Sequence, residues 1–204
     1  MFVIVRHGNT FSAGEPPRRI GARTDLPLTP AGQEQAARLG AHFAASGWCF
    51  SRVLVSPLRR TRETAQAILA AQADAPMPER CDLLREIDHG PDEDQTEDAV
   101  LARIGKAALD AWDAHGTVPP GWQVDAQARV AGWADLLRAV TPENTAPTLL
   151  VTSNGAARFA LLADPALAQA AASLDSLKLP TGGYGVIVRG PDGTLRVPAW
   201  GQRP

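Results

Sequence analysis

The sequence predicts an α/β fold in which helices cover both faces of a doubly wound sheet. Three short apolar runs, at residues 2–5, 53–55 and 149–152, lack the polar alternation of a half-exposed strand, as expected for strands buried on both faces. Segments whose apolar residues recur at helical spacing lie between these runs. Alternation of strands and helices along a chain is the pattern of an α/β domain with a parallel sheet.

The first two helices are marked by the residues at their amino ends. Thr29 is a good N-cap and Pro30 suits the first helical position, so a helix is expected from there to the Ser-Gly pair at 46–47. Ser56 and Pro57 repeat this signature. The second helix is therefore expected to begin directly after the second apolar run.

The remaining elements follow from periodicity and turn residues. Two further helices are expected within 98–115 and 124–140. Segments 184–188 and 195–197 have strand-like composition, and the Gly-Pro-Asp-Gly sequence at 190–193 joins them. A hairpin is expected at the carboxyl end of the chain.

Length and composition favour one domain over residues 1–204. The chain is 45% hydrophobic and 21% charged, and its net charge of −2 gives no support for binding to nucleic acid or a membrane. Cys49 and Cys81 lack metal-ligand spacing and are expected to be reduced thiols. No apolar stretch has the length of a membrane span, and the first apolar run stops at Arg6, too early for a signal peptide. A cytoplasmic location is expected.

A histidine stands at the carboxyl end of the first predicted strand. Arg6, His7 and Gly8 follow the run at 2–5 directly. Ligands of open α/β sheets bind outside the carboxyl ends of the strands, so His7 is expected in a crevice with Arg6 beside it to hold negative charge. A lone histidine that only caps a strand through a backbone carbonyl is the alternative.

An arginine cluster follows the second predicted strand in the same way. Arg59, Arg60 and Arg62 fall in the first turns of the predicted helix. A helix amino end favours anions, and a guanidinium adds a planar fork that matches phosphate oxygens. We expect Arg59 and Arg62 to be exposed and Arg60 to bind phosphate.

Four blocks in this order resemble the histidine phosphatase superfamily, the phosphoglycerate-mutase-like enzymes. The resemblance implies a three-layer, mostly parallel sheet with one antiparallel strand, and an active site where the strand ends converge. The blocks are Arg6-His7-Gly8-Asn9-Thr10, the segment from Gly21 to Ala36, the segment from Ser56 to Ala65 and the segment from Leu83 to Gly90.

The resemblance also implies a role for each matching residue. His7 matches the nucleophile, Arg6 and Arg60 match the arginines that bind the phosphoryl group, and Glu86 matches the proton donor to the leaving group. The chemistry is consistent: two guanidiniums lower the pKa of a nearby imidazole and keep it nucleophilic. Glu86 can give a proton if burial or a neighbouring carboxylate such as Asp88 raises its pKa. The expected catalytic residues are His7 and Glu86, and the expected substrate-binding residues are Arg6, Asn9, Thr10, Arg60 and Asn154.

The chain departs from the family pattern after the third apolar run. The family usually places a second histidine before a glycine there, whereas this chain has Asn154 before Gly155. Losing one charge-assisted contact in such a site costs about 3 kcal/mol, or about a hundredfold in rate. A slow enzyme, an enzyme with a compensating residue, and a phosphate-binding protein all remain open. Asn154 as a mere helix cap, and His89 as either a solvated turn residue or a replacement, are further alternatives.

Two segments bear on the substrate. The loop from Phe11 to Arg23 either folds over the pocket, with Arg18, Arg19 or Arg23 contacting substrate, or is solvated. The acidic residues from Asp92 to Asp98 are expected to form a solvated face, and the part from Asp94 to Asp98 is expected to open a helix. At a pocket entrance they would repel multiply anionic substrates, which weakens the interpretation as a glycolytic mutase.

The sequence therefore supports two functions. The first is a phosphatase that hydrolyses small phosphomonoesters through a phosphohistidine on His7, with no cofactor and no metal, because arginines supply the positive charge. The second is an inactive or weakened relative that binds phosphate or a phosphorylated ligand. A small phosphorylated metabolite is the expected partner, while the physiological substrate and the oligomeric state do not follow from the sequence.

Overall fold

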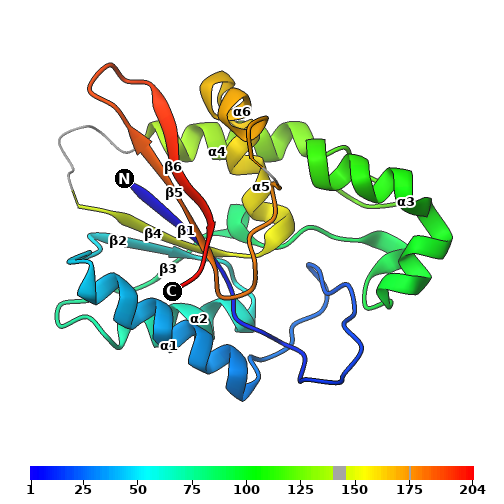
Figure 1. Cartoon of the computed structure of the whole chain (residues 1–204), viewed down its shortest axis with the longest axis horizontal. Helices are drawn as coiled ribbons and strands as arrows, with labels where there is room; N and C mark the ends of the chain where they lie inside the picture. The colour runs from blue at the N-terminus through cyan, green and yellow to red at the C-terminus, as the bar shows by residue number, and fades with distance from the viewer. Residues whose placement is uncertain (140–145, 175) are drawn as a thin grey trace.

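The structure, a computed structural model, describes residues 1–139, 146–174 and 176–204 (Figure 1). A six-stranded sheet forms its centre, in the order β3-β2-β4-β1-β5-β6. The pairs β3·β2, β2·β4 and β4·β1 are parallel, and β5 is antiparallel to both β1 and β6. The strands are β1 (Phe2–Arg6), β2 (Arg52–Val55), β3 (Glu79–Arg80), β4 (Thr148–Thr152), β5 (Tyr184–Arg189) and β6 (Leu195–Gln202).

Helices cover both faces of this sheet, so the predicted three-layer architecture is confirmed. Figure 1 shows α1 and α2 on one face and α4, α5 and α6 on the other. Of the strands that the structure describes, β5 alone runs against the rest, as the mostly parallel prediction requires. The helices are α1 (Pro30–Ala45), α2 (Arg59–Leu69), α3 (Glu97–His115), α4 (Ala126–Arg138), α5 (Asn154–Leu162) and α6 (Pro165–Ala171).

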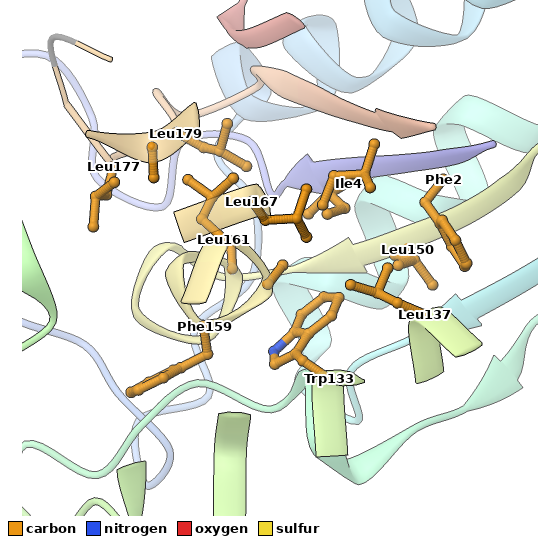
Figure 2. Close-up of a cluster of buried hydrophobic side chains, with 14 of the residues drawn as sticks. Phe2, Ile4, Trp133, Leu137, Leu150, Phe159, Leu161, Leu167, Leu177 and Leu179 are labelled. Carbon is orange, nitrogen blue, oxygen red and sulfur yellow. The ribbon is translucent and has the colours of Figure 1, made fainter. Parts of the chain in front are cut away.

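Alternate side chains of β1 pack into two separate hydrophobic cores, one on each face of the sheet. Val3 and Val5 pack in the cluster under α1 and α2, together with Leu39. Ile4 belongs to the opposite cluster, which Figure 2 shows with Trp133 of α4 beneath it. All five side chains are fully buried, and each such aliphatic side chain contributes about 1.5–3 kcal/mol to folding. Burial on both faces explains why the strand sequence does not alternate.

The predicted helix starts are right for α1 and wrong for α2. The Thr29 hydroxyl accepts the Gly32 N–H at 3.1 Å, which is the expected cap of α1. α2 begins at Arg59, two residues later than the Ser56-Pro57 signature predicts. The Arg59 N–H donates instead to the Asp25 carboxylate at 2.6 Å, so a distant loop caps this helix.

The other predicted elements are present with small differences in extent. α3 begins at Glu97 and is interrupted at Gly105, whose φ of 79° is left-handed. α4 ends at Arg138, and the predicted end at Val140 lies outside the described residues. The hairpin forms as β5 and β6, while β3 and α6 were not predicted. Within the described ranges, no helix is long and apolar enough to cross a membrane.

Candidate active site

The carboxyl ends of β1 and β4 open onto one cavity of about 580 Å³, whereas Arg60, which follows β2, does not line it and meets the site through His7. His7 follows β1, Arg60 lies in the first turn of α2 after β2, and Asn154 opens α5 after β4. Glu86 reaches the same place from the loop after the short 3₁₀ turn Asp82–Leu84. The expected site residues that line the cavity are Arg6, His7, Asn9, Thr10, Glu86 and Asn154.

Two contacts fix the protonation pattern of His7. Its Nδ1 lies 2.8 Å from the Gly8 carbonyl, and Arg60 Nε donates to its Nε2 at 3.1 Å. Because a guanidinium N–H can only donate, Nε2 carries the lone pair and Nδ1 carries the proton. Burial, followed by the charges of Arg60 and Arg6, lowers the pKa of His7 well below 6.5. The imidazole is therefore a neutral base with its lone pair on Nε2.

Two glycines bring the loop of His7 against α1. A Cβ on Gly8 would lie 2.3 Å from the Gly32 carbonyl oxygen, and a Cβ on Gly32 would lie 2.2 Å from the Asn9 carbonyl oxygen. The Asn9 carbonyl also accepts the Thr29 N–H at 2.9 Å. Neither glycine can carry a side chain without moving backbone, which accounts for both in the sequence.

Arg60 is held from a loop that sequence analysis left undecided. Its Nη1 donates to the Thr24 carbonyl at 2.7 Å and its Nη2 to the Gly21 carbonyl at 3.2 Å. Glu93 in turn accepts the Gly21 N–H at 2.9 Å and the Thr24 hydroxyl at 2.8 Å. Arg60 is buried, and Arg59 and Arg62 are exposed as predicted.

The acidic segment is only in part the solvated face that its charge suggests, because Asp94, Glu97 and Asp98 are exposed whereas Asp92 and Glu93 turn inward. Burial alone would raise the pKa of Glu93, but hydrogen bonds from His89, Thr24 and the backbone lower it to about 2. Asp92 is 1% exposed and accepts the Trp122 indole N–H at 2.7 Å. Each of these carboxylates meets donors from other segments, which a run of charge in the sequence does not reveal.

The loop that follows His7 folds partly over the cavity. Arg18 and Arg19 line it, and they pair with Asp94 at 3.0 Å and with Glu97. Arg23 does not line the cavity. It donates instead to Asp88 at 3.1 Å and to the Gly90 carbonyl. One part of the loop, with Arg18 and Arg19, therefore lies at the cavity as the first alternative predicts, whereas Arg23 lies away from it.

Arg6 and Asn154 are joined through the backbone of one residue, Leu179. Arg6 Nη1 donates to the Leu179 carbonyl at 2.7 Å, and the Leu179 N–H donates to Asn154 Oδ1 at 3.0 Å. Within the described part of the chain, the buried Nε of Arg6 has no hydrogen-bond partner. Burial lowers the pKa of Arg6 to about 10, with the Glu86 carboxylate opposing and Arg60 reinforcing the shift.

Asn154 does not cap α5 with its side chain. Ser153 occupies the N-cap position, and the side-chain oxygen of Asn154 is taken by Leu179. The helix-cap alternative is therefore wrong. The Asn154 side chain lines the cavity, where its NH₂ group remains as a neutral donor.

Glu86 is held by the amino end of α5. Its Oε1 accepts the N–H groups of Ile87 at 2.9 Å and Ala156 at 3.0 Å, and its Oε2 accepts the Gly155 N–H at 3.0 Å. A Cβ at Gly155 would lie 2.5 Å from Oε1, so this position requires glycine. Oε2, with a single donor, keeps a lone pair on which a proton can sit.

Asp88 and His89, which follow Glu86 closely in the sequence, have other partners. Asp88 accepts from Arg23 and from the Gly90 N–H at 2.7 Å. His89 is 5% exposed, not solvated, and its ring lies edge-on to Trp122 at 4.6 Å. It lines the cavity, with Nδ1 3.5 Å from Glu93.

Sequence reasoning missed several cavity residues, among them Trp112, Arg158 and Lys178. Trp112 and Arg158 are buried, and Lys178 lies at the edge. Arg158 had a usable signal, because it follows Asn154 by four residues and so lies on the same face of the helix. Trp112 and Lys178 had none, since they come from α3 and from the loop before β5.

Comparisons with known proteins identify relatives over most of the chain. A family model described as histidine phosphatase superfamily (branch 1) matches residues 2–201. A 2,3-bisphosphoglycerate-dependent phosphoglycerate mutase of Rhizobium etli is 33% identical over 132 residues, which are 63% of this chain and 62% of that protein. A protein of Erwinia tasmaniensis named a probable phosphoglycerate mutase is 32% identical over 158 residues, covering 76% and 69%. The match thus spans less than two thirds of the first relative.

Solved structures share the fold at lower identity. A mycobacterial glucosyl-3-phosphoglycerate phosphatase has a TM-score of 0.77 at 20% identity, covering all of this chain and 99% of that one. The alpha-ribazole phosphatase of Shigella flexneri has a TM-score of 0.72 at 21% identity, covering 99% and 96%. These similarities establish a shared three-dimensional arrangement.

Proposed function

The chain belongs to the histidine phosphatase superfamily (branch 1), and from this premise we propose that it hydrolyses small phosphomonoesters through a phosphohistidine on His7. The observation that carries the proposal is the fixed tautomer of His7. Its Nδ1 is tied to Gly8 and its Nε2 lone pair faces a buried arginine. A neutral imidazole beside two guanidiniums is suited to attack a phosphoryl group.

In the first step His7 Nε2 attacks phosphorus. The new P–N bond forms as the P–O bond to the alcohol breaks, and Glu86 gives its proton to the leaving oxygen. Arg60 Nε, which donates to Nε2, then donates to a phosphoryl oxygen, and the unpartnered Nε of Arg6 supplies a second donor. In the second step water attacks phosphorus, Glu86 takes the proton of that water, and His7 leaves with its lone pair restored.

The first test is phosphate release from 4-nitrophenyl phosphate across pH. A histidine with an ordinary pKa would be half protonated, and half inactive, at pH 6.5. Because burial and two arginines lower the pKa of His7, its base form persists below this pH. We expect kcat/KM, which reports the free enzyme, to stay level from pH 7.5 to 6, in buffers with a chelator as well as without. A halving of kcat/KM at pH 6.5 would contradict the proposed state of His7.

A second candidate is a relative that binds phosphate but turns over slowly. Asn154 favours it, because an amide donor stays neutral while negative charge develops in the transition state. We expect inorganic phosphate or vanadate to bind measurably to the natural protein. Asn154→His is expected to raise kcat by about tenfold or more by restoring a cationic donor.

Asn154→Ala is the control for this comparison. It removes the acceptor for the Leu179 N–H as well as the donor to phosphate, so it is expected to be slower than the natural protein. All three proteins are compared on 4-nitrophenyl phosphate. A natural protein that is already fast and gains nothing from histidine would show that Asn154 does not weaken the site.

Phosphoglycerate mutase activity remains less favoured than hydrolysis. The argument that acidic residues at the entrance repel multiply anionic substrates is, however, weaker than the sequence implied. The acidic residue Glu97 does line the cavity, but it pairs with Arg19. A phosphorylated metabolite as substrate and a cytoplasmic location stay predictions.

A further inference from the structure

Arg158 is a buried cation that uses only part of its hydrogen-bonding capacity. Its side chain is 0% exposed, lines the cavity, and stacks over the Trp112 ring with 4.0 Å from Cζ to the centroid. Nη1 donates to the Trp112 carbonyl. Neither Nε nor Nη2 has a hydrogen-bond partner among residues 1–139, 146–174 and 176–204. Buried donors of a charged group without acceptors are costly, and an acceptor supplied by a ligand removes this cost.

Around Arg158 there is one more positive charge than there are carboxylates paired with it. Asp113 Oδ1 is 3.7 Å from Arg158 Nη2, beyond hydrogen-bond distance, and Asp113 Oδ2 is 2.5 Å from Lys178 Nζ. Two cations therefore share one carboxylate. Arg18 and Arg19, the other cations contributed by the neighbouring loop, each have a carboxylate of their own. The excess charge suits a single anionic group.

Arg158 lies one helical turn from the backbone that holds Glu86. The N–H groups of Gly155 and Ala156, in the first turn of α5, donate to the Glu86 carboxylate, and Arg158 follows these two residues on the same helix. Both Glu86 and Arg158 line the cavity. Burial lowers the pKa of Arg158 to about 10, while the charges of Asp113 and Glu86 oppose that shift. Because Glu86 is the proposed proton donor to the leaving oxygen, Arg158 is on the leaving-group side of the cavity.

We propose that Arg158 and Lys178 form a subsite for one anionic group carried by the alcohol part of the phosphomonoester. This subsite rests on the proposed function, since it places the substrate with its phosphoryl group at His7 and its ester oxygen at Glu86. Arg158 offers Nε and Nη2 as a fork to a carboxylate, and Lys178 offers a third donor from the cavity edge.

The test compares 4-carboxyphenyl phosphate with 4-carbamoylphenyl phosphate, which have the same shape and differ in charge. We expect the natural protein to prefer the carboxylate, and Arg158→Met and Lys178→Met each to lower the ratio of the two kcat/KM values by about tenfold, the worth of one charge-assisted hydrogen bond. Arg158→Lys should retain part of the ratio. Lys106→Met is the control, because Lys106 pairs with Asp110 on α3 as Lys178 pairs with Asp113 but does not line the cavity.

The ratio of the two kcat/KM values distinguishes a subsite from a structural role. A substitution that only disturbs the structure lowers kcat/KM equally on both substrates, so the ratio stays the same. Equal losses on both substrates, or no preference in the natural protein, would overturn the subsite. Lys178 is half exposed, so Lys178→Met decides the matter if Arg158→Met does not fold. The Kd values of both compounds for His7→Ala, measured by calorimetry, do not depend on turnover. Tighter binding of the carboxylate compound to this variant would support the subsite. If the natural protein hydrolysed neither compound, that result would refute the phosphatase proposal but not the subsite.

Discussion

His7→Ala is expected to lower kcat/KM for 4-nitrophenyl phosphate by about 10⁴-fold or more, since it removes the only atom proposed to bond to phosphorus. Rapid mixing with labelled substrate, followed by quenching without acid, is expected to trap a phosphoryl adduct on the natural protein. The adduct should be labile in acid and stable in base, as a phosphoramidate is, and absent from His7→Ala.

His89→Gln is the matched control for this variant. His89 is also a buried histidine that lines the cavity, but its ring packs on Trp122 and its Nδ1 faces Glu93. The adduct should persist in His89→Gln. If His7→Ala kept full activity, or if the adduct disappeared only from His89→Gln, the nucleophile would be misassigned.

Glu86→Gln is expected to divide substrates by their leaving groups. An alkyl phosphate releases a strongly basic alkoxide that needs a proton, so we expect a loss of about 10³-fold. Nitrophenolate leaves without help, so the loss on 4-nitrophenyl phosphate should be less than about tenfold. Steady-state kinetics on glycerol 3-phosphate and 4-nitrophenyl phosphate measure both values.

Asp88→Asn provides the comparison for the acid. Asp88 is two residues from Glu86 but binds Arg23 and the Gly90 N–H, so its variant should show no dependence on the leaving group. Equal losses on both substrates in Glu86→Gln would mean that Glu86 acts by holding the amino end of α5, through Gly155 and Ala156, and not by proton transfer.

Strand ends were predictable from sequence because their signals are local. The run at 2–5 is uniformly apolar and ends at Arg6, so His7 had to leave the sheet at its carboxyl edge. The same logic placed Arg60 near the carboxyl end of β2, and Arg60 still lies in the first turn of α2 and contacts His7 although the helix begins two residues later than predicted. That error arose because the cap comes from Asp25, and no local pattern reports a partner across a fold.

Contacts between distant segments account for what the sequence did not predict. Glu93 is buried because loop 21–24 supplies donors for it, although its neighbours in sequence are also acidic. Asn154 bonds Leu179, which is twenty-five residues farther along the chain. Both contacts exist only after the loops have packed, so the pattern of charge and polarity in either segment gives no indication of them.

The position of β1 in the sheet has a consequence for how the protein is made. Phe2–Arg6 is synthesised well before its two ladder partners, which begin at Thr148 and Tyr184. The His7 carbonyl accepts the Gly182 N–H, so His7 is held in place only after residue 182 has emerged from the ribosome. Until then an apolar strand has two unpaired edges, which invites aggregation, and such long-range pairing folds slowly. Chains cut short before β4 should therefore require chaperones and carry no activity.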